Sequence, residues 1–215
     1  MDRQASQALR LQLVREIAQG GMGTVYEALQ QGADGFQKRV AVKSLRPELS
    51  NDETFVRMFV DEAKLVADLV HENIVQTYQL ERDGEGYFMV MEYVHGVSLR
   101  DLLRSHADGE RLPVPLAVFI ASRIARGLAY AHSRVDGEGR PQHIVPRDVW
   151  RSNVLITGEG LPKLSDFGIA RAQARGGPAE GAIVGKFAYM SPEQALHLDL
   201  DGRADLYSLG TVLFE

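Results

Sequence analysis

The chain has 215 residues, of which 45% are hydrophobic and 25% are charged, a balance typical of an ordinary globular protein and not of a disordered one. Its net charge of −5 and its pI near 5.7 disfavour a nucleic acid or an anionic membrane surface as a general partner, since both need a basic surface. Because the sequence contains no cysteine, disulfides, thiolate metal sites and a cysteine nucleophile are excluded.

Neither a membrane span nor an export signal is expected. No run of residues approaches the apolar length that crosses a bilayer, and residues 1–10 lack the apolar core of a signal peptide. We therefore expect a soluble, cytoplasmic protein without membrane contact in this part of the chain.

Residues 11–18 and 24–29 have the pattern of two short strands around a glycine-rich turn. Gly20 and Gly23 carry no Cβ, so the backbone of this turn could approach a phosphate group closely. A glycine-rich turn alone is more often a plain hairpin than a nucleotide-binding loop, so it gains weight only from a suitable lysine further along the chain.

A third strand is predicted for residues 39–45, with Lys43 on the face opposite Val42. Apolar residues at helical spacing then predict a helix over residues 52–69, capped by Asn51 or Asp52, and Glu62 lies in this helix. Both charged residues have an ordinary alternative: lysine is usually exposed, and Glu62 with its acidic neighbour could belong to a solvated face.

Strands at residues 75–80 and 87–92, joined by a polar turn, complete a predicted five-stranded antiparallel sheet. The longest helical pattern covers residues 113–134 and belongs to the core rather than to the chemistry. The turn-rich residues 136–141 after it are expected at the surface.

The most informative stretch is residues 143–168, which holds Arg147-Asp148, Asn153 and Asp166-Phe167-Gly168. Two apolar runs around Gly158-Glu159-Gly160 predict a β-hairpin that brings Asp166 back beside Asn153. A carboxylate and an amide oxygen held together suit Mg²⁺, which takes few protein oxygens and shares its shell with phosphates and water. Each motif alone could be an ordinary turn or strand start; their order and spacing favour a site.

Arg-Asp-x-x-x-x-Asn followed by Asp-Phe-Gly resembles the eukaryotic-like serine/threonine protein kinases of bacteria. The resemblance covers the chain from about Leu11 onward. It implies an α+β, bilobal fold: after an N-terminal extension (residues 1–10), a small lobe (residues 11–94) with the five-stranded sheet and a helix C, then a mainly helical large lobe (residues 95–215).

The resemblance also implies the chemistry: transfer of the γ-phosphoryl group of ATP, with Mg²⁺, to serine or threonine hydroxyls of a protein substrate. Lys43, paired with Glu62, would hold the α- and β-phosphates. Asp148 would orient the acceptor hydroxyl, and Asn153 and Asp166 would bind the metal.

Further nucleotide-binding residues follow from the resemblance: Ala18, Gly20, Gly23, Val25, Ala41, Met91, Glu92, Val94 and Leu155. Ala18 departs from the family, which has a glycine there. The backbone from Glu92 to Val94, in the linker between the lobes, would hydrogen-bond adenine.

Two departures concern the catalytic loop. Pro146 replaces the usual histidine, whose ring packs beneath Phe167, so we expect Phe167 to lose a neighbour at a cost of about 1–3 kcal/mol. Trp150 replaces a lysine that neutralises the transferred phosphoryl group. Lys186 could supply this charge, or it could be an ordinary solvated loop lysine.

Two further expectations concern the last third of the chain. Residues 169–190 contain no serine or threonine, so we expect no activation by phosphorylation of those residues. Residues 203–215 resemble helix F of the large lobe, with Asp205 anchoring the catalytic-loop backbone. The family continues beyond this helix, so we expect a truncated large lobe with an exposed apolar stripe made of Leu206, Leu209, Val212, Leu213 and Phe214.

The departures leave two alternatives open. One is a catalytically impaired pseudokinase that serves as a nucleotide-binding or scaffold module, because the ligand residues remain while Ala18, Pro146 and Trp150 differ. The other is a fragment that does not fold stably because its large lobe is incomplete.

Overall fold

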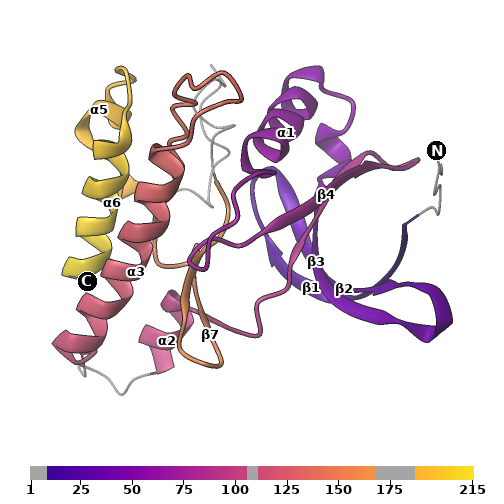
Figure 1. The fold of residues 1–215 in the computed structure, drawn as a ribbon, viewed down its shortest axis with the longest axis horizontal. Coiled ribbons are helices and arrows are strands. Elements are labelled where there is room, and N and C mark those ends of the chain that lie inside the picture. The colour runs from indigo at the N-terminus through magenta and orange to yellow at the C-terminus, as the bar shows by residue number, and fades with distance from the viewer. Residues whose placement is uncertain (1–8, 106–110, 168–186) are drawn as a thin grey trace.

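A five-stranded antiparallel sheet with the strand order β1-β2-β3-β5-β4 forms one of the two lobes seen in Figure 1, as the sequence predicted. The computed structural model describes residues 9–105, 111–167 and 187–215. The strands are β1 (Arg10–Gln19), β2 (Gly23–Gln31), β3 (Gln37–Leu45), β4 (Thr77–Arg82) and β5 (Tyr87–Glu92), with 3-10 turns at Ala33–Gly35 and Pro47–Leu49. The strand boundaries lie within about two residues of most of the predicted ones.

The two faces of this sheet are covered differently. One face carries an apolar cluster of Ala28, Val40, Val42 and Val90. On the other face, helix α1 (Glu53–Val66) packs Phe59 and Ala63 against Leu45 of β3. Because Lys43 lies two residues before Leu45 on the same strand, it points to the face that α1 covers.

Helix α1 begins and ends for identifiable reasons. The side chain of Asp52 accepts a hydrogen bond from the Thr54 amide at 2.8 Å, so Asp52 is the cap. The helix ends at Val66, three residues before the predicted end, where the Leu69 amide bonds the Val66 carbonyl in a turn.

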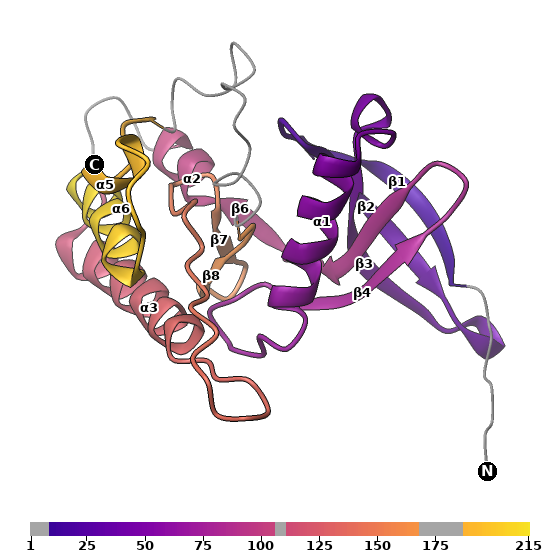
Figure 2. The same ribbon diagram turned by 90° about the horizontal axis from the view of Figure 1, so that it is seen from above.

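The predicted hairpin after Asn153 is confirmed, and it belongs to a second, three-stranded sheet with the order β6-β7-β8. Its strands are β6 (Gly96–Ser98), β7 (Val154–Thr157) and β8 (Pro162–Leu164). This sheet lies between the small lobe and the helices of the large lobe (Figures 1 and 2). Strand β6 was not predicted because three residues are too few for an alternating pattern; it forms by pairing with β7.

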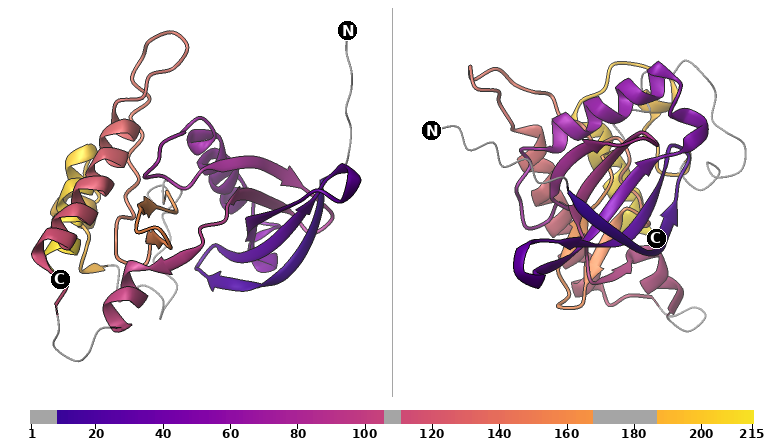
Figure 3. Two further views of the ribbon diagram at one scale, coloured as in Figure 1. Left: turned by 60° about the horizontal axis from the view of Figure 1, so that its bottom comes forward. Right: turned by 90° about the vertical axis from the view of Figure 1, so that its right-hand side faces the viewer.

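The described helices of the large lobe are α2 (Leu99–Ser105), α3 (Val114–His132), α5 (Pro192–Ala195) and α6 (Gly202–Phe214). Helices α3 and α6 run side by side (Figure 3). By length and composition α3 could cross a membrane, contrary to expectation, and yet it buries Ile120, Ile124 and Leu128 in the large-lobe core. Helices α2 and α5 are too short to have been predicted.

The apolar stripe expected on α6 is only partly correct. Leu206, Leu213 and Phe214 are 52%, 47% and 89% exposed. Leu209 and Val212 are buried instead, because their side of the helix belongs to the large-lobe core cluster. The prediction failed for these two residues because it took every apolar position on the helix as one face.

Replacing Gly202 by alanine is expected to destabilise the large lobe. A Cβ at Gly202 would lie 2.5 Å from Nδ1 of His132, and that imidazole holds the buried Asp205 at 2.8 Å. We expect the free energy of unfolding, measured by urea denaturation, to fall by about 1–3 kcal/mol, the usual cost of overpacking.

Gly210→Ala in the same helix is the matched control. A Cβ at Gly210 meets nothing within 4 Å. This variant should keep the wild-type stability or gain up to ~1 kcal/mol from the higher helix propensity of alanine. Equal losses in the two variants would contradict the steric explanation.

Candidate active site

Lys43 is the centre of an ion network that joins the two lobes. Its Nζ lies 2.8 Å from Oε1 of Glu62 on α1 and also bonds Oδ1 of Asp166, which follows β8. Lys43 and Glu62 are buried, with side chains 11% and 7% exposed, while Asp166 is 38% exposed. The lysine and glutamate are therefore partners within the small lobe, and neither belongs to a solvated face.

This network shifts the protonation equilibria of its members. Burial disfavours the charge of Lys43, but the attraction of Asp166 and Glu62 is larger in sum and raises the pKa of the ammonium. Burial is the main cause that raises the pKa of Glu62 from 4.5 to about 7. The attraction of Lys43 lowers this pKa, and the repulsion of Asp166 offsets part of that decrease. The site thus holds its lysine charged.

Asp148, Asn153 and Asp166 come together at the start and end of the β7–β8 hairpin. The Asn153 amide group donates to the Asp148 carbonyl at 2.9 Å and to Oδ2 of Asp148 at 3.0 Å. The Asn153 carbonyl in turn accepts bonds from the Ser165 amide at 2.8 Å and hydroxyl at 3.1 Å. This pairing places Asp166, the next residue, near Asn153, as predicted.

The donor set fits a hard cation that keeps part of its shell for other ligands. Asp148 engages Nδ2 of Asn153, so Oδ1 is the Asn153 atom that a metal would take. Asp166 contributes a partly exposed carboxylate. Among the described residues there is no group of three His, Cys, Asp or Glu side chains that could hold a metal ion.

The backbone of Arg147 is held in an unfavourable conformation next to these residues. Its φ of 61° lies in the left-handed region, which costs a residue of this type roughly 1–3 kcal/mol. The Arg147 amide donates to Oδ1 of Asp205 at 2.7 Å, and the Arg147 carbonyl accepts from Nε2 of Gln194 at 2.9 Å. These bonds confirm Asp205 as the anchor of the catalytic loop.

Asp205 has a second partner that the sequence did not reveal. Nε2 of His132, on α3, lies 2.8 Å from Oδ2 of Asp205, whose side chain is fully buried. Burial raises the pKa of Asp205, while the bonds from His132 and the Arg147 amide lower it. A histidine at the end of an apolar helix carries no signal of this role, because its partner lies 73 residues away.

Several predicted nucleotide residues share the sheet face of Lys43. Val25 lies opposite Lys43, and Ala41 lies opposite Met91, so these four side chains point the same way. Ala18 lies opposite Val25 in β1. Glu92 ends β5, Val94 follows it, and Leu155 lies on β7.

The two matching glycines have different structural roles. A Cβ at Gly23 would lie 2.6 Å from the Ser44 carbonyl oxygen, so Gly23 is required by the close approach of β2 and β3. Gly20 is exposed, and a Cβ there would meet only ordinary contact, at 3.5 Å. Of these two glycines, Gly20 is the one that contacts within the protein do not require.

The chain matches the protein kinase domain family over residues 11–215. The chain belongs to the protein kinase family.

Individual relatives agree with this assignment. Tyrosine-protein kinase MasK of Myxococcus xanthus is 40% identical over 205 residues, which are 94% of this chain and 32% of MasK. Serine/threonine-protein kinase PknA of Corynebacterium glutamicum is 39% identical over 212 residues, 96% of this chain and 42% of PknA. PrkC of Bacillus subtilis, another serine/threonine-protein kinase, is 37% identical over 207 residues, 96% of this chain and 30% of PrkC.

The fold agrees as well. The crystal structure of the Mycobacterium tuberculosis PknI kinase domain matches with a TM-score of 0.71 at 29% identity, covering 95% of this chain and 70% of that domain chain. The chain spans less than half the length of the three sequence relatives named above.

Phe167 is buried although Pro146 stands in place of the histidine. Its side chain is 4% exposed and belongs to the large-lobe core cluster, which also includes Ile144 and Val149. The cost expected from the loss of the histidine stays a prediction.

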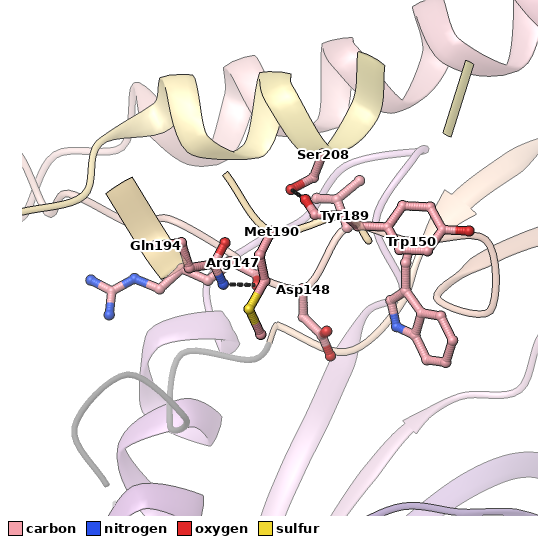
Figure 4. A pocket seen from close by; sticks show the side chains of 8 residues that line it. Arg147, Asp148, Trp150, Tyr189, Met190, Gln194 and Ser208 are labelled. Carbon is pink, nitrogen blue, oxygen red and sulfur yellow. Dashed lines mark hydrogen bonds between the residues drawn. The ribbon is translucent and has the colours of Figure 1, made fainter. Parts of the chain in front are cut away.

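Trp150, the other departure in the catalytic loop, lies close to Asp148. Trp150 lines a small hollow with Asp148, Met190, Gln194 and other residues (Figure 4). Its ring lies 6.4 Å from that of Tyr189, at an angle of 59°. Lys186, the proposed source of the missing charge, lies outside the described residues, as does Gly168.

Tyr189 carries the one hydroxyl side chain of residues 169–190. It is 4% exposed, and its hydroxyl bonds Oε2 of Glu215. Burial and this acceptor raise the pKa of the phenol. The hydroxyl is therefore not accessible for modification in this conformation. The absence of activation by serine or threonine phosphorylation stays a prediction.

We expect the pH dependence of stability to differ between the wild type and Glu62→Gln. Because the folded-state pKa of Glu62 is about 7 and its ordinary value is 4.5, folding favours the protonated carboxyl. This contribution is complete below about pH 4.5 and is lost as the pH rises to about 7.

Urea denaturation without nucleotide or metal, between pH 4.5 and 8, measures the difference. The wild type should lose on the order of 1–3 kcal/mol relative to Glu62→Gln over this range, because glutamine at this position does not titrate. Parallel pH profiles of the two proteins would show that Glu62 is charged throughout.

Proposed function

We propose that this domain transfers the γ-phosphoryl group of ATP to serine or threonine hydroxyls of a protein substrate, with residues 11–94 as the small lobe and 95–215 as large-lobe sequence. The observation that carries the proposal is that Lys43 bonds both Glu62 and Asp166. An ammonium so held is in place for a phosphate group, and Asp166 for a metal. The need for ATP supports a cytoplasmic location, and the net charge of −5 supports a protein over a nucleic acid as partner.

Binding of the nucleotide would be divided between the two lobes. Lys43 would contact the α- and β-phosphates while Glu62 keeps it oriented, and Gly20 would let the loop backbone approach them. The adenine would lie against Val25 and Ala41, with Leu155 and Met91 completing the pocket and the Glu92–Val94 backbone supplying hydrogen bonds. Ala18 lies at the mouth of this region, opposite Val25.

Asn153 and Asp166 would hold Mg²⁺. When bound, the ion would supply positive charge that neutralises the phosphates. Asp166 bonds Lys43 through Oδ1, so the same carboxylate would serve both the lysine and the metal. Lys43 is also held by Glu62.

Asp148 would orient the acceptor hydroxyl and accept its proton. Its carboxylate is positioned by the Asn153 amide at 3.0 Å, and the Arg147 backbone beside it is fixed on both sides. The contribution of these residues is mainly positioning and charge stabilisation around the phosphoryl group.

Radiolabelled phosphate transfer from ATP with Mg²⁺, to the chain itself and to a generic basic protein, tests this function. We expect transfer by the wild type and a loss of at least ~100-fold in Asp148→Asn, which keeps the shape and removes the proton acceptor. Nucleotide-dependent thermal shift should persist in Asp148→Asn, since binding does not need that carboxylate.

The outcomes separate the candidate functions. Thermal shift without transfer by the wild type would identify a nucleotide-binding module. Phosphoamino-acid analysis of the product should give phosphoserine or phosphothreonine. Phosphotyrosine would instead show that the acceptor residue is tyrosine, as in the name of the relative MasK of Myxococcus xanthus.

A second experiment concerns the positive charge that Trp150 cannot supply. We propose that Lys186 supplies it, because it stands where the family has a threonine that contacts the catalytic residues. Removal of one preorganised charge from the transition state costs about 3–4 kcal/mol, so Lys186→Ala and Lys186→Thr should each slow transfer by ~100-fold or more.

The double variant Trp150→Lys/Lys186→Thr restores the family pattern and serves as the control. It should recover transfer to within about 10-fold of the wild type, because the new lysine stands two residues after Asp148. Wild-type rates in both single Lys186 variants would show that this lysine is only a solvated loop residue.

A further inference from the structure

Glu27 on β2 is a buried carboxylate with three partners from three different elements. Its side chain is 5% exposed. Oε2 accepts from Nε of Arg15 at 2.9 Å and from the Tyr93 hydroxyl at 3.1 Å, and Oε1 lies 3.0 Å from Nη1 of Arg39. A carboxylate this deeply buried needs such partners, because a charge without them is costly to desolvate.

The cluster of Arg15, Glu27, Arg39 and Tyr93 adjoins the proposed nucleotide site. Glu27 lies two residues after Val25, on the same face of β2, and directly opposite Ala41. Ala41 lies opposite Met91, the second residue before Tyr93. The cluster therefore lies at the edge of the nucleotide-facing surface, where the sheet meets the hinge segment (residues 92–95).

The hinge segment leaves the sheet at this point. Within the described parts of the chain, no backbone–backbone hydrogen bond involves Tyr93 or Val94. The side chain of Tyr93 supplies the attachment instead. Its hydroxyl bonds Glu27, and the Arg39 guanidinium lies 5.7 Å from the centre of its ring. The ring centres of Tyr93 and His95 are 4.7 Å apart, with the two rings at 78°. This attachment ties the hinge segment to the small lobe.

A second attachment ties the same segment to the large lobe. Oε1 of Glu92 lies 2.8 Å from Nζ of Lys163 on β8, and Oε2 of Glu92 lies 3.0 Å from the same Nζ. Oε2 also accepts a bond from the Gln76 amide at 3.2 Å. The lysine and glutamate side chains are 12% and 24% exposed, so this pair is weakly screened by solvent.

We propose that Tyr93, through Glu27, and Lys163, through Glu92, are positioning residues that fix the hinge backbone for adenine and thereby select ATP over GTP. This inference rests on the proposed nucleotide site. Adenine offers an amino donor and a ring-nitrogen acceptor at the edge where guanine offers a carbonyl acceptor and an N–H donor. Hinge backbone groups held in fixed positions can therefore pair with adenine, whereas guanine would leave donors and acceptors on both sides without a partner.

The decisive variant is Tyr93→Phe, which removes one hydroxyl and leaves Glu27 paired with Arg15 and Arg39. Direct titration of the full chain with ATP and, separately, with GTP measures both dissociation constants. We expect the dissociation constant for ATP to rise about 3- to 10-fold, because the variant loses part of the effect of a hydrogen bond to a charged group. The dissociation constant for GTP should stay the same. Lys163→Met should likewise raise the dissociation constant for ATP and so reduce the preference for ATP over GTP.

Tyr87→Phe is the matched control, because Tyr87 lies on β5 and its ring contacts Arg82 at 5.2 Å, while its hydroxyl bonds none of the described residues. It should keep the wild-type preference. Equal weakening of ATP and GTP in Tyr93→Phe would mean a merely structural role and overturn the inference, as would an unchanged affinity for ATP. A wild-type chain that binds neither nucleotide would overturn the proposed function and this inference with it.

Discussion

The buried ion network of Lys43 is the interaction on which the arrangement of the two lobes depends. One ammonium bonds a carboxylate from α1 and another from the segment after β8, residues that are 19 and 123 positions away in sequence. Both lobes must be folded and correctly placed before these three groups meet. Burial raises the pKa of Glu62, so folding disfavours the ionised form of this side chain. The positive charge of Lys43 offsets the repulsion between the Glu62 and Asp166 carboxylates.

The parts of the fold that local patterns encode were predictable. Alternation gave the five strands of the small lobe, Asp52 marked the start of α1, and the glycine-rich turn after Thr157 marked the hairpin. The order Arg147-Asp148, Asn153, Asp166 then indicated the site, because a tight hairpin leaves few ways to place its two ends. Each of these inferences depends on residues close together in the chain.

What the sequence did not reveal depends on contacts between distant segments. Strand β6 exists only because β7 pairs with it. The role of His132 follows from where α3 meets α6, and the role of Gln194 follows from where α5 meets the catalytic loop. The burial of Phe167 without a neighbouring histidine depends on the volume that other core residues fill, which no motif describes.

The same distinction applies to the departures of the catalytic loop. The Arg147 amide donates to Asp205 and the Arg147 carbonyl accepts from Gln194, and neither bond involves the side chain of residue 146. A proline before Arg147 removes an amide and an imidazole but leaves that scaffold intact. Trp150 differs from Pro146 in the kind of effect it would have. A change at residue 146 would act through local packing, whereas the lack of a lysine at residue 150 would act through the charge near the transferred phosphoryl group. In our proposal only another cation can restore that charge.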